Sequence, residues 1–219
     1  MTEIENGNIT NRLPTKEALI QQYNVSRNTI RNTISYLNKA GITYTIQGSG
    51  AYIRPPRKEN SIPINETNGF TRSLPNQVIT TKIIDFNLVE ANEEIMALLK
   101  CQSNDLVYRV ERLRLKNNIP FAHEEAYYHK SVIHYLNQEI VMDSIFNYIT
   151  KDLNLTIGFS DKYITCQKSE KNIADHLLLN ENDPCIVIKD NVYLNNGILF
   201  NASKITYHYQ HCEFYCSNQ

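Results

Sequence analysis

Arg112 and Arg114 stand two residues apart within Leu106–Leu115, a stretch whose pattern predicts a β-strand. Residues two apart on a strand project from the same face, so the two guanidinium groups point together. Like charges this close are unfavourable unless an anion or carboxylates compensate them, and phosphate or carboxylate is a natural bidentate partner of arginine. Glu124 in the next strand can accept hydroxyl or amine hydrogens, and Ser144 near a helix start can offer its hydroxyl and backbone N–H to an anion. This set predicts a binding site for a small anionic ligand.

A structural interpretation of the same arginines stays open. Glu111, Glu124 or Glu125 can pair with them in an internal network that needs no ligand. Spacing alone does not separate the two interpretations, because both bring carboxylates and guanidinium groups together on neighbouring strands.

A second set of polar side chains follows helical spacing. Ile30, Ile34 and Leu37 form an apolar stripe, and the opposite face carries Arg27, Asn28, Arg31, Asn32 and Ser35. Arginine binds guanine edges or phosphates with two hydrogen bonds, and asparagine reads adenine. This face therefore predicts contact with the major groove of DNA.

The elements around this face predict a winged helix-turn-helix. A first helix begins after Pro14 with Thr15 as its N-cap, and Ala18, Leu19 and Tyr23 give it an apolar side. Ser26 is the N-cap of the second helix, which ends before Gly41. Two strands, Ile42–Ile46 and Ala51–Arg54, flank a tip with small side chains, Gln47-Gly48-Ser49-Gly50.

In these motifs the segment resembles the DNA-binding domain of GntR-family bacterial transcription regulators. The resemblance rests on Leu13–Thr15, Val25–Arg31, Gly41 and Gln47–Ile53. It implies operator contacts by Arg27, Thr29 and Arg31, with Gly48 at the wing tip near the minor groove. The full set of expected DNA-binding residues is Thr15, Ser26, Arg27, Asn28, Thr29, Arg31 and Gly48.

Two departures from the family pattern stand in the first helix. Glu17 occupies a position where such regulators usually carry arginine. Ala18 occupies the position where they usually carry the glutamate that completes the capping box. The family also has a full helix before the motif, of which residues 1–6 supply at most the last turn. Either the true start lies upstream or the head is a shortened DNA-binding domain, and in both cases we expect Glu17 to repel phosphate.

The remainder of the chain contains an internal repeat. Residues 95–99, 104–105, 106–115 and 117–118 have counterparts 78 residues later at 173–177, 182–183, 184–193 and 195–196. Each copy predicts a short helix, a turn, a strand, an asparagine-rich hairpin turn and a second strand. Between the copies, Asp143 is expected to cap a helix through Ile145, Ile149 and Leu153, and 158–167 to form another strand. Two copies indicate one pseudo-symmetric domain.

This second half resembles the UTRA effector-binding domain of the HutC branch of the same family, which shares an α+β fold with chorismate lyase. The marks are Gly69–Thr71, Glu111–Arg114, Asn118–Glu124, Ser144–Phe146 and Phe200–Tyr207. The resemblance implies effector contacts by Phe70, Thr71, Arg112, Arg114, Glu124, Ser144, Phe146, Asn201 and Tyr207. The family often has Tyr and Glu where this chain has Phe146 and Asn201. The expected architecture is a winged helix-turn-helix over 1–54, a linker over 55–68, and a mixed α/β UTRA domain over 69–219.

Composition agrees with nucleic-acid contact at one end of the chain. The net charge of −1 divides into about +4 over residues 1–57 and −5 over 58–219. No apolar run is long enough to span a bilayer and no signal-peptide core is evident, so a cytoplasmic protein with five reduced cysteines is expected. His208, Cys212 and Cys216 would lie too far apart along a continuous strand to share a metal ion. We therefore predict neither a metal site nor a cofactor.

These features predict a ligand-responsive transcription regulator rather than an enzyme. We expect a repressor that binds a palindromic operator as a homodimer and responds to a small anionic effector, a phosphorylated sugar or a carboxylate. One alternative is a degenerate regulator whose shortened head no longer binds DNA. Another is a chorismate-lyase-like enzyme using His123 and Glu124 as acid and base, although no nucleophile–base pair or metal set is evident.

Overall fold

The chain folds as two units, Met1–Lys58 with Cys216–Gln219, and Glu59–Tyr215. The computed structural model describes residues 2–7, 9–67 and 69–217, and leaves out the side chains of Thr2, Glu5, Thr71 and Arg72. The side chain of Thr71, a predicted effector contact, therefore lies outside the described part of the chain. Each unit is considered by itself.

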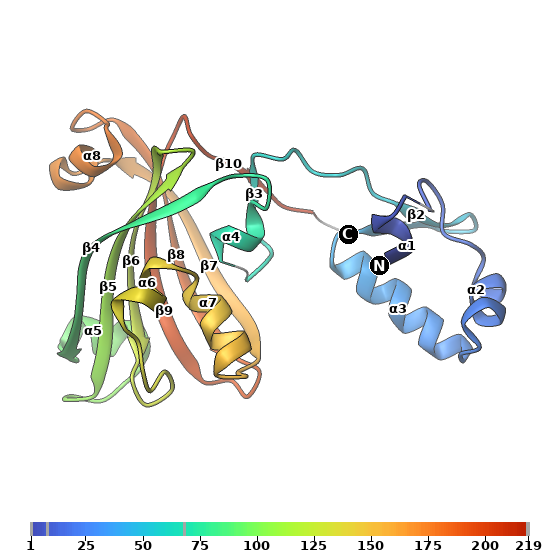
Figure 1. Cartoon of the computed structure of the whole chain (residues 1–219), viewed down its shortest axis with the longest axis horizontal. Helices are drawn as coiled ribbons and strands as arrows, with labels where there is room; N and C mark the ends of the chain where they lie inside the picture. Colours follow the sequence, from blue (N-terminus) through green and yellow to red (C-terminus); the bar gives the residue numbers. More distant parts are fainter. Residues whose placement is uncertain (1, 8, 68, 218–219) are drawn as a thin grey trace. The chain divides into compact units, whose positions relative to one another are not determined.

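The first unit is a winged helix-turn-helix (Figure 1). Its elements are α1 (Thr2–Glu5), α2 (Lys16–Tyr23), α3 (Arg27–Lys39), β1 (Thr43–Ile46) and β2 (Gly50–Ile53). Thr15 caps α2 by accepting from the N–H of Ala18 at 3.2 Å, and Ser26 caps α3 by accepting from that of Thr29 at 3.1 Å. Gly41 follows α3 with a φ of +70°, where glycine carries no steric penalty. Both predicted N-caps and the glycine stop are confirmed.

The core of this unit is small and apolar. Its buried side chains are Leu13, Leu19, Ile30, Ile34, Leu37 and Ala51. The predicted apolar side of α2 is wrong for Ala18 and Tyr23, which are exposed. The ring of Tyr23 is half exposed, and its hydroxyl donates a hydrogen bond to Glu3 Oε2 of α1 at 2.9 Å. Leu19 is thus the buried residue of α2.

The second unit is built on one antiparallel sheet of six strands. The strands are β4 (Ile79–Glu90), β5 (Leu106–Lys116), β6 (Ile119–His129), β7 (Ile157–Lys168), β8 (Pro184–Leu194) and β9 (Leu199–His208). Their order is β4-β5-β6-β9-β8-β7, and a separate parallel pair joins β3 (Ser61–Pro63) to β10 (Glu213–Tyr215). β3 lies inside the segment 55–68 that the sequence suggests as a linker, and its side chains are buried.

The predicted repeat is confirmed by this topology. In the first copy, α5 (Glu93–Leu99) precedes the β5–β6 hairpin, and in the second, α8 (Lys171–Leu177) precedes the β8–β9 hairpin. Residues with left-handed backbone conformation also recur 78 positions apart in the two copies: Leu178 corresponds to Lys100, and Asn182 to Asn104. The two copies meet where β6 pairs with β9. The strand order is therefore symmetric about this pair, with β8 and β9 of the second copy in the places that β5 and β6 take in the first.

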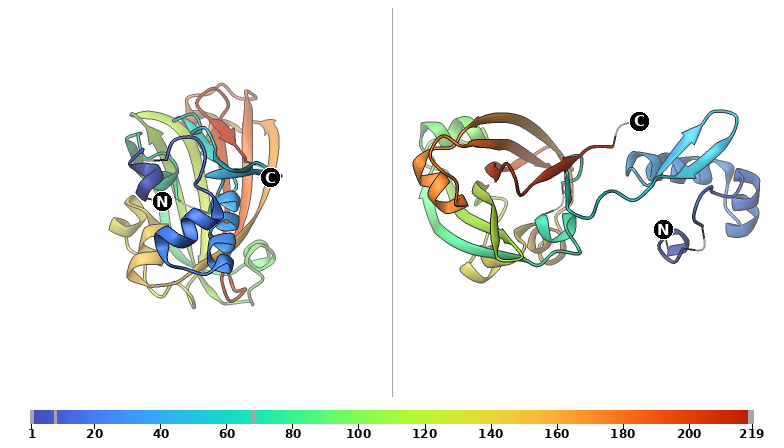
Figure 2. Two further views of the ribbon diagram at one scale, coloured as in Figure 1. Left: turned by 90° about the vertical axis from the view of Figure 1, so that its right-hand side faces the viewer. Right: turned by 90° about the horizontal axis from the view of Figure 1, so that it is seen from above.

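Different helices cover the two faces of the curved sheet (Figures 1 and 2). α5 and α8 pack on β6 and β9 from the convex side, which we call the outer face. The opposite, inner face is covered by α4 (Phe70–Ser73), α6 (Gln138–Met142), α7 (Ile145–Asn147) and the π-helix η1 (Tyr148–Asp152). Ile145 and Ile149 of the last two elements are buried against Val110, Tyr128 and Phe200 of the sheet.

Two local predictions are corrected here. Asp143 does not cap the helix after it: Ser144 does, by accepting from the N–H of Asn147 at 3.2 Å. The continuous strand expected from His208 to Cys216 is also wrong. β9 ends at His208, where the chain turns, bringing the rings of His208 and His211 to 3.7 Å between centroids.

All five cysteines carry free thiols. Among the described residues, no helix has the length and apolar character needed to cross a membrane.

Candidate functional site

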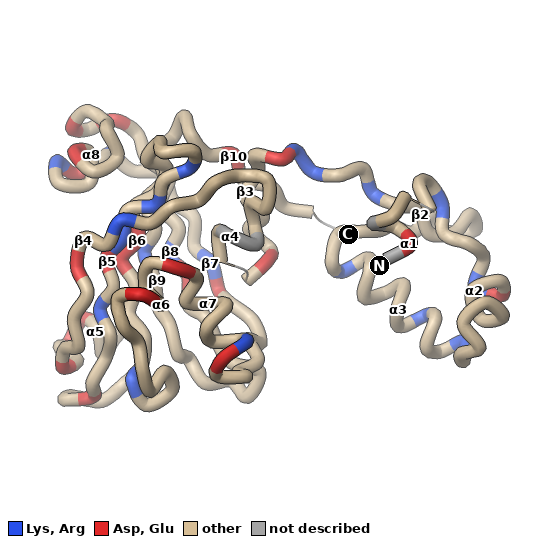
Figure 3. The backbone as a smooth tube through the Cα atoms, viewed as in Figure 1, with Lys and Arg blue, Asp and Glu red and all other residues tan. Residues whose placement is uncertain are grey.

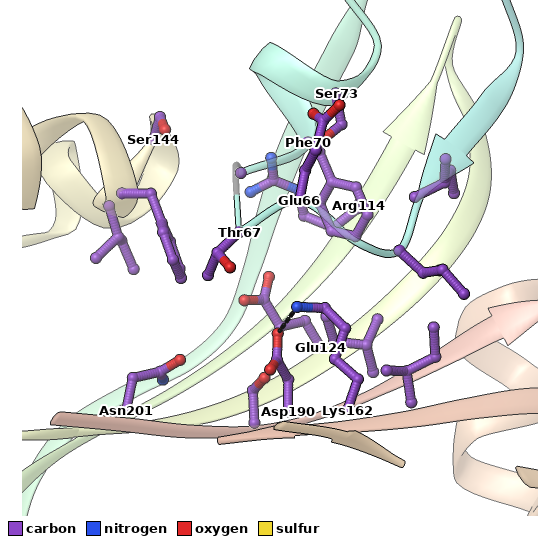
Figure 4. A pocket seen from close by; sticks show the side chains of 18 of the residues that line it. Glu66, Thr67, Phe70, Ser73, Arg114, Glu124, Ser144, Lys162, Asp190 and Asn201 are labelled. Carbon is purple, nitrogen blue, oxygen red and sulfur yellow. Dashed lines mark ion pairs between the residues drawn. The ribbon is translucent and has the colours of Figure 1, made fainter. Parts of the chain in front are cut away.

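The inner face of the sheet carries a pocket within the second unit (Figure 4). Eight predicted effector contacts line it: Phe70, Arg112, Arg114, Glu124, Ser144, Phe146, Asn201 and Tyr207. β5 and β6 contribute the charged groups, β9 contributes Asn201 and Tyr207, and α4 and α7 contribute the two phenylalanines. The strand alternation and the short helices therefore gather residues that are up to 137 positions apart in the sequence.

Arg112 is already paired inside the protein. Its guanidinium donates to both carboxylate oxygens of Glu124, at 2.8 to 3.2 Å, and to the carbonyl oxygen of Val141 at 2.8 Å. Both side chains are buried, and Arg112 and Glu124 face each other directly in the β5–β6 register. Burial favours the neutral acid, but the two arginines outweigh it and hold the pKa of Glu124 below its ordinary value. The structural interpretation of the arginines therefore holds for Arg112.

Arg114 has no such partner. It is 4% exposed and makes no ion pair or hydrogen bond with the described residues, and its Nε is buried. Its guanidinium lies 5.3 Å from the ring centroid of Phe70, which also packs edge-on against Phe121. Burial, followed by repulsion from Arg112, lowers the pKa of Arg114 to about 10. A buried cation in this state attracts an anion strongly.

The other lining residues add polar groups and an aromatic wall. Asn201 donates from Nδ2 to the carbonyl oxygen of Tyr127 at 3.1 Å, which leaves its side-chain oxygen as an acceptor on the pocket side (Figure 4). The Ser144 oxygen accepts from the helix backbone, so its own O–H remains able to donate. Tyr207 is buried between Phe70 and Phe214, with centroid distances of 6.1 and 4.9 Å.

Lys162 and Asp190 also line the pocket, and the sequence analysis missed both. Lys162 Nζ lies 3.0 Å from Asp190 Oδ2 and donates to Ser160 Oγ at 2.6 Å (Figure 4). Asp190 Oδ1 is buried without a hydrogen-bond partner in the described part of the chain, and burial raises the pKa of Asp190 despite Lys162. The pairing comes from the β7–β8 register, a contact between strands that alternation within one strand does not reveal.

In the first unit, five of the seven predicted DNA-binding residues lie at the start of α3 or on its exposed face. Ser26, Arg27, Asn28, Thr29 and Arg31 are all exposed. Figure 3 shows basic positions along α3 and an acidic one on α2. That acid is involved in an ion pair, because Glu17 Oε1 lies 3.0 Å from Arg27 Nη2. Thr15 and Ser26 act as caps, and the Thr29 hydroxyl bonds to that of Ser26 at 2.9 Å.

The wing tip carries a cation that the sequence analysis missed. Arg12 donates to the carbonyl oxygen of Ser49 and lies 5.6 Å above the ring of Tyr52. Gly48 has a φ of +77°, and a Cβ there would meet nothing within 4 Å, so the tip is open to a DNA backbone. In the sequence, Arg12 is an isolated arginine directly before Leu13. Its position at the wing follows only from the pairing of residues 11–12 with β2, which the sequence does not reveal.

Comparison with known proteins agrees with both units. The family model described as bacterial regulatory proteins, gntR family, matches residues 3–53, and the UTRA domain model matches residues 76–213. The chain belongs to the GntR family and carries a UTRA domain. The HTH-type transcriptional regulator YydK of Bacillus subtilis, whose role is uncharacterised, is 34% identical over 203 residues, covering 93% of this chain and 86% of YydK. A crystal structure of YydK covers 100% of this chain and 96% of its own, with a TM-score of 0.89 and 31% identity.

Two further relatives are named repressors. The HTH-type transcriptional repressor NagR of Bacillus subtilis is 27% identical over 210 residues, covering 94% of this chain and 86% of NagR. The mannosyl-D-glycerate transport/metabolism system repressor MngR of Escherichia coli is 25% identical over 194 residues, covering 88% and 80%. This GntR-family chain is thus a transcriptional regulator with a DNA-binding head and an effector-binding UTRA domain, and its relatives are regulators, not enzymes.

Proposed function

We propose that this GntR-family regulator is a repressor whose UTRA pocket binds a small carbohydrate anion such as a sugar phosphate. A homodimer binds a palindromic operator through two heads, and the effector releases or reorients them. The observation that carries the proposal is Arg114, a buried cation that forms no ion pair or hydrogen bond with the described residues, so that Glu124 and Asp143 offset its charge only from a distance.

Acceptor groups around Arg114 support the carbohydrate part of the effector. Asp190 Oδ1 is unpartnered, and Asn201 leaves its side-chain oxygen on the pocket side. Such oxygens bind hydroxyl or amine hydrogens, whereas Arg114 and the Ser144 hydroxyl suit an anionic oxygen. The name of MngR, a repressor of a mannosyl-D-glycerate system, is in keeping with this chemistry because glycerate is a carboxylate.

We assign effector binding to Phe70, Thr71, Arg114, Ser144, Phe146, Asn201 and Tyr207, with Arg112 holding Glu124 in position. On the head, we assign operator contacts to Asn28, Thr29, Arg31 and Gly48, with Arg27 available once it leaves Glu17. Thr15 and Ser26 combine helix capping with a position from which their hydroxyls face a phosphate.

A melting-temperature screen of sugar phosphates and small carboxylates tests the proposal. A ligand that binds the folded state raises the Tm of the wild type. Arg114→Met should abolish the shift, because loss of a charge-assisted contact removes about 1.5–3 kcal/mol of binding, roughly 10- to 150-fold in affinity. Arg31→Ala is the matched control with an intact pocket, and its Tm shift should equal that of the wild type. Equal shifts in wild type and Arg114→Met would refute the pocket assignment.

One observation favours a second function, a sensor that has lost DNA binding. Glu17 pairs with Arg27 and so places negative charge beside the recognition face. Gel shifts with the promoter upstream of the chain's own gene separate the two functions. The repressor requires a specific complex that Arg31→Ala weakens by about 1–3 kcal/mol, whereas the degenerate sensor gives no specific complex.

A further inference from the structure

The outer face of the sheet, opposite the pocket, carries a cluster of metal-ligating side chains. Glu111 precedes Arg112 on β5, and His123 precedes Glu124 on β6, so strand alternation turns both away from the pocket. α8 covers this face of β6 and brings His176 to them. The cluster is therefore assembled from three elements and has no local sequence signature.

The geometry of the cluster suits a shared ion. Glu111 Oε1 lies 3.0 Å from His123 Nε2, and one ligand atom from each of Glu111, His123 and His176 lies within 4.8 Å of the other two. The two imidazole rings are stacked, at 7° with centroids 5.3 Å apart, so one ring must turn before both can ligate the same ion in their planes. His176 Nδ1 is buried and has no hydrogen-bond partner among the described residues. A buried ring nitrogen without a protein partner calls for a water or an ion to satisfy it.

Electrostatics also favour a cation at this place. Arg109 forms ion pairs with the carboxylates of Asp85, Glu111 and Glu125, at 2.8 Å from Glu111 and 3.2 Å from Glu125. One positive charge thus faces three negative charges, and the group as a whole is negative. Arg109 binds the Oε2 atom of Glu111, which leaves Oε1 turned toward His123.

We propose that Glu111, His123 and His176 bind a divalent transition-metal ion, with Zn²⁺ as the best match. Two imidazole nitrogens and one carboxylate oxygen are a zinc donor set, with bonds of about 2.0–2.2 Å. Tetrahedral ligands at that bond length lie roughly 3.3 Å apart, close to the 3.0 Å between Glu111 Oε1 and His123 Nε2, and reorientation of the His176 ring on binding would complete the set. The fourth position is open to water or another ligand.

The ion would fasten α8 to β5 and β6. These two strands carry Arg112 and Glu124 on the inner face, so metal binding stiffens the floor of the effector pocket from behind. This inference concerns a site separate from the pocket and stands independently of the effector proposed above.

Titration of the full-length, chelator-treated protein with ZnCl₂ by calorimetry tests the site. We expect one saturable site in the wild type and at least tenfold weaker binding in both His176→Asn and Glu111→Gln. The matched control is His129→Asn, which breaks the other cluster of potential ligands among the described residues, Cys101, Asp105 and His129, and should leave the affinity unchanged.

Thermal melts without metal check that each variant is folded, and melts with Zn²⁺ should raise the Tm of the wild type and of His129→Asn more than that of His176→Asn. The proposal is overturned if the wild type shows no saturable binding, or if His176→Asn and Glu111→Gln retain its affinity. Loss of binding in His129→Asn alone would assign the ion to the other cluster and overturn it as well.

Discussion

Two arginines on one strand face have different surroundings and therefore different roles. Arg112 binds both oxygens of Glu124, so each charge compensates the other in a place that water does not reach. Arg114, two residues further, has the face of Phe70 as its neighbour and no carboxylate within ion-pair distance in the described structure. The same residue type at the same depth is a structural group in one case and, in the function that we propose, a ligand-binding group in the other.

Substituting each arginine should separate these roles in the effector-free protein. Arg112→Met leaves Glu124 as a buried charge with no direct partner, and should lower the free energy of unfolding by about 3 kcal/mol. Arg114→Met removes a buried cation that has no direct ion pair, and should leave the free energy of unfolding unchanged or raise it. Urea unfolding followed by circular dichroism measures both. Equal losses in the two variants would contradict the different roles.

The stability contributed by the Arg112–Glu124 pair should depend on pH. The pKa of Glu124 is lower in the folded protein than its ordinary value, so the unfolded chain binds the proton more readily. The contribution is therefore present above the ordinary pKa of a glutamate and is lost as the pH falls through the lower, folded value. The difference in unfolding free energy between wild type and Arg112→Met should shrink on acidification from pH 7. A difference that grows toward acid would reverse the assignment.

At the scale of elements, local signals were predicted well and contacts between elements were not. Thr15, Ser26 and the asparagine turns of the repeat act on their own backbone, so the sequence reveals them. Asp143 and Ser144 are both good caps, but Asp143 ends α6 as its C-cap and Ser144 is the N-cap of α7. The Lys162–Asp190 pair and the Arg12 contact with the wing depend on strand register and on long-range bridging, which one-dimensional periodicity does not contain.

The ion pair between α2 and α3 gives a prediction for the head. Glu17→Gln should strengthen operator binding, because it frees Arg27 and removes a negative charge beside the phosphates. The exposed pair is worth about 0.2–1 kcal/mol, so a gain of roughly 1.4- to 5-fold is expected from release of Arg27 alone. Fluorescence anisotropy at several salt concentrations measures it. Glu3→Gln makes the same charge change beside Tyr23 and is the control; an equal gain there would reduce the effect to net charge.

At the scale of the whole molecule, the head has little positive charge for a DNA-binding module. About +4 over residues 1–57 supplies few phosphate contacts, so a single head should bind weakly. Two heads on a palindrome add their contacts and match two-fold symmetry. We therefore expect a dimer at micromolar concentration by light scattering without DNA, and footprints with two equivalent half-sites. A monomer under these conditions, or protection of one half-site only, would contradict this arrangement.

Coupling between the pocket and the head gives the most demanding test of a regulator. An effector that lowers operator affinity by a given factor must have its own affinity lowered by operator DNA by the same factor, because the two binding equilibria are linked. We expect a factor of about 5 to 150, measured by anisotropy in one direction and calorimetry in the other. Arg114→Met should bind operator like the wild type yet fail to release it. Arg31→Ala should bind effector like the wild type and show the effect of DNA only at higher DNA concentrations, because its operator affinity is about 1–3 kcal/mol weaker. Effector binding that leaves operator affinity unchanged would make the pocket a binding site without a regulatory role.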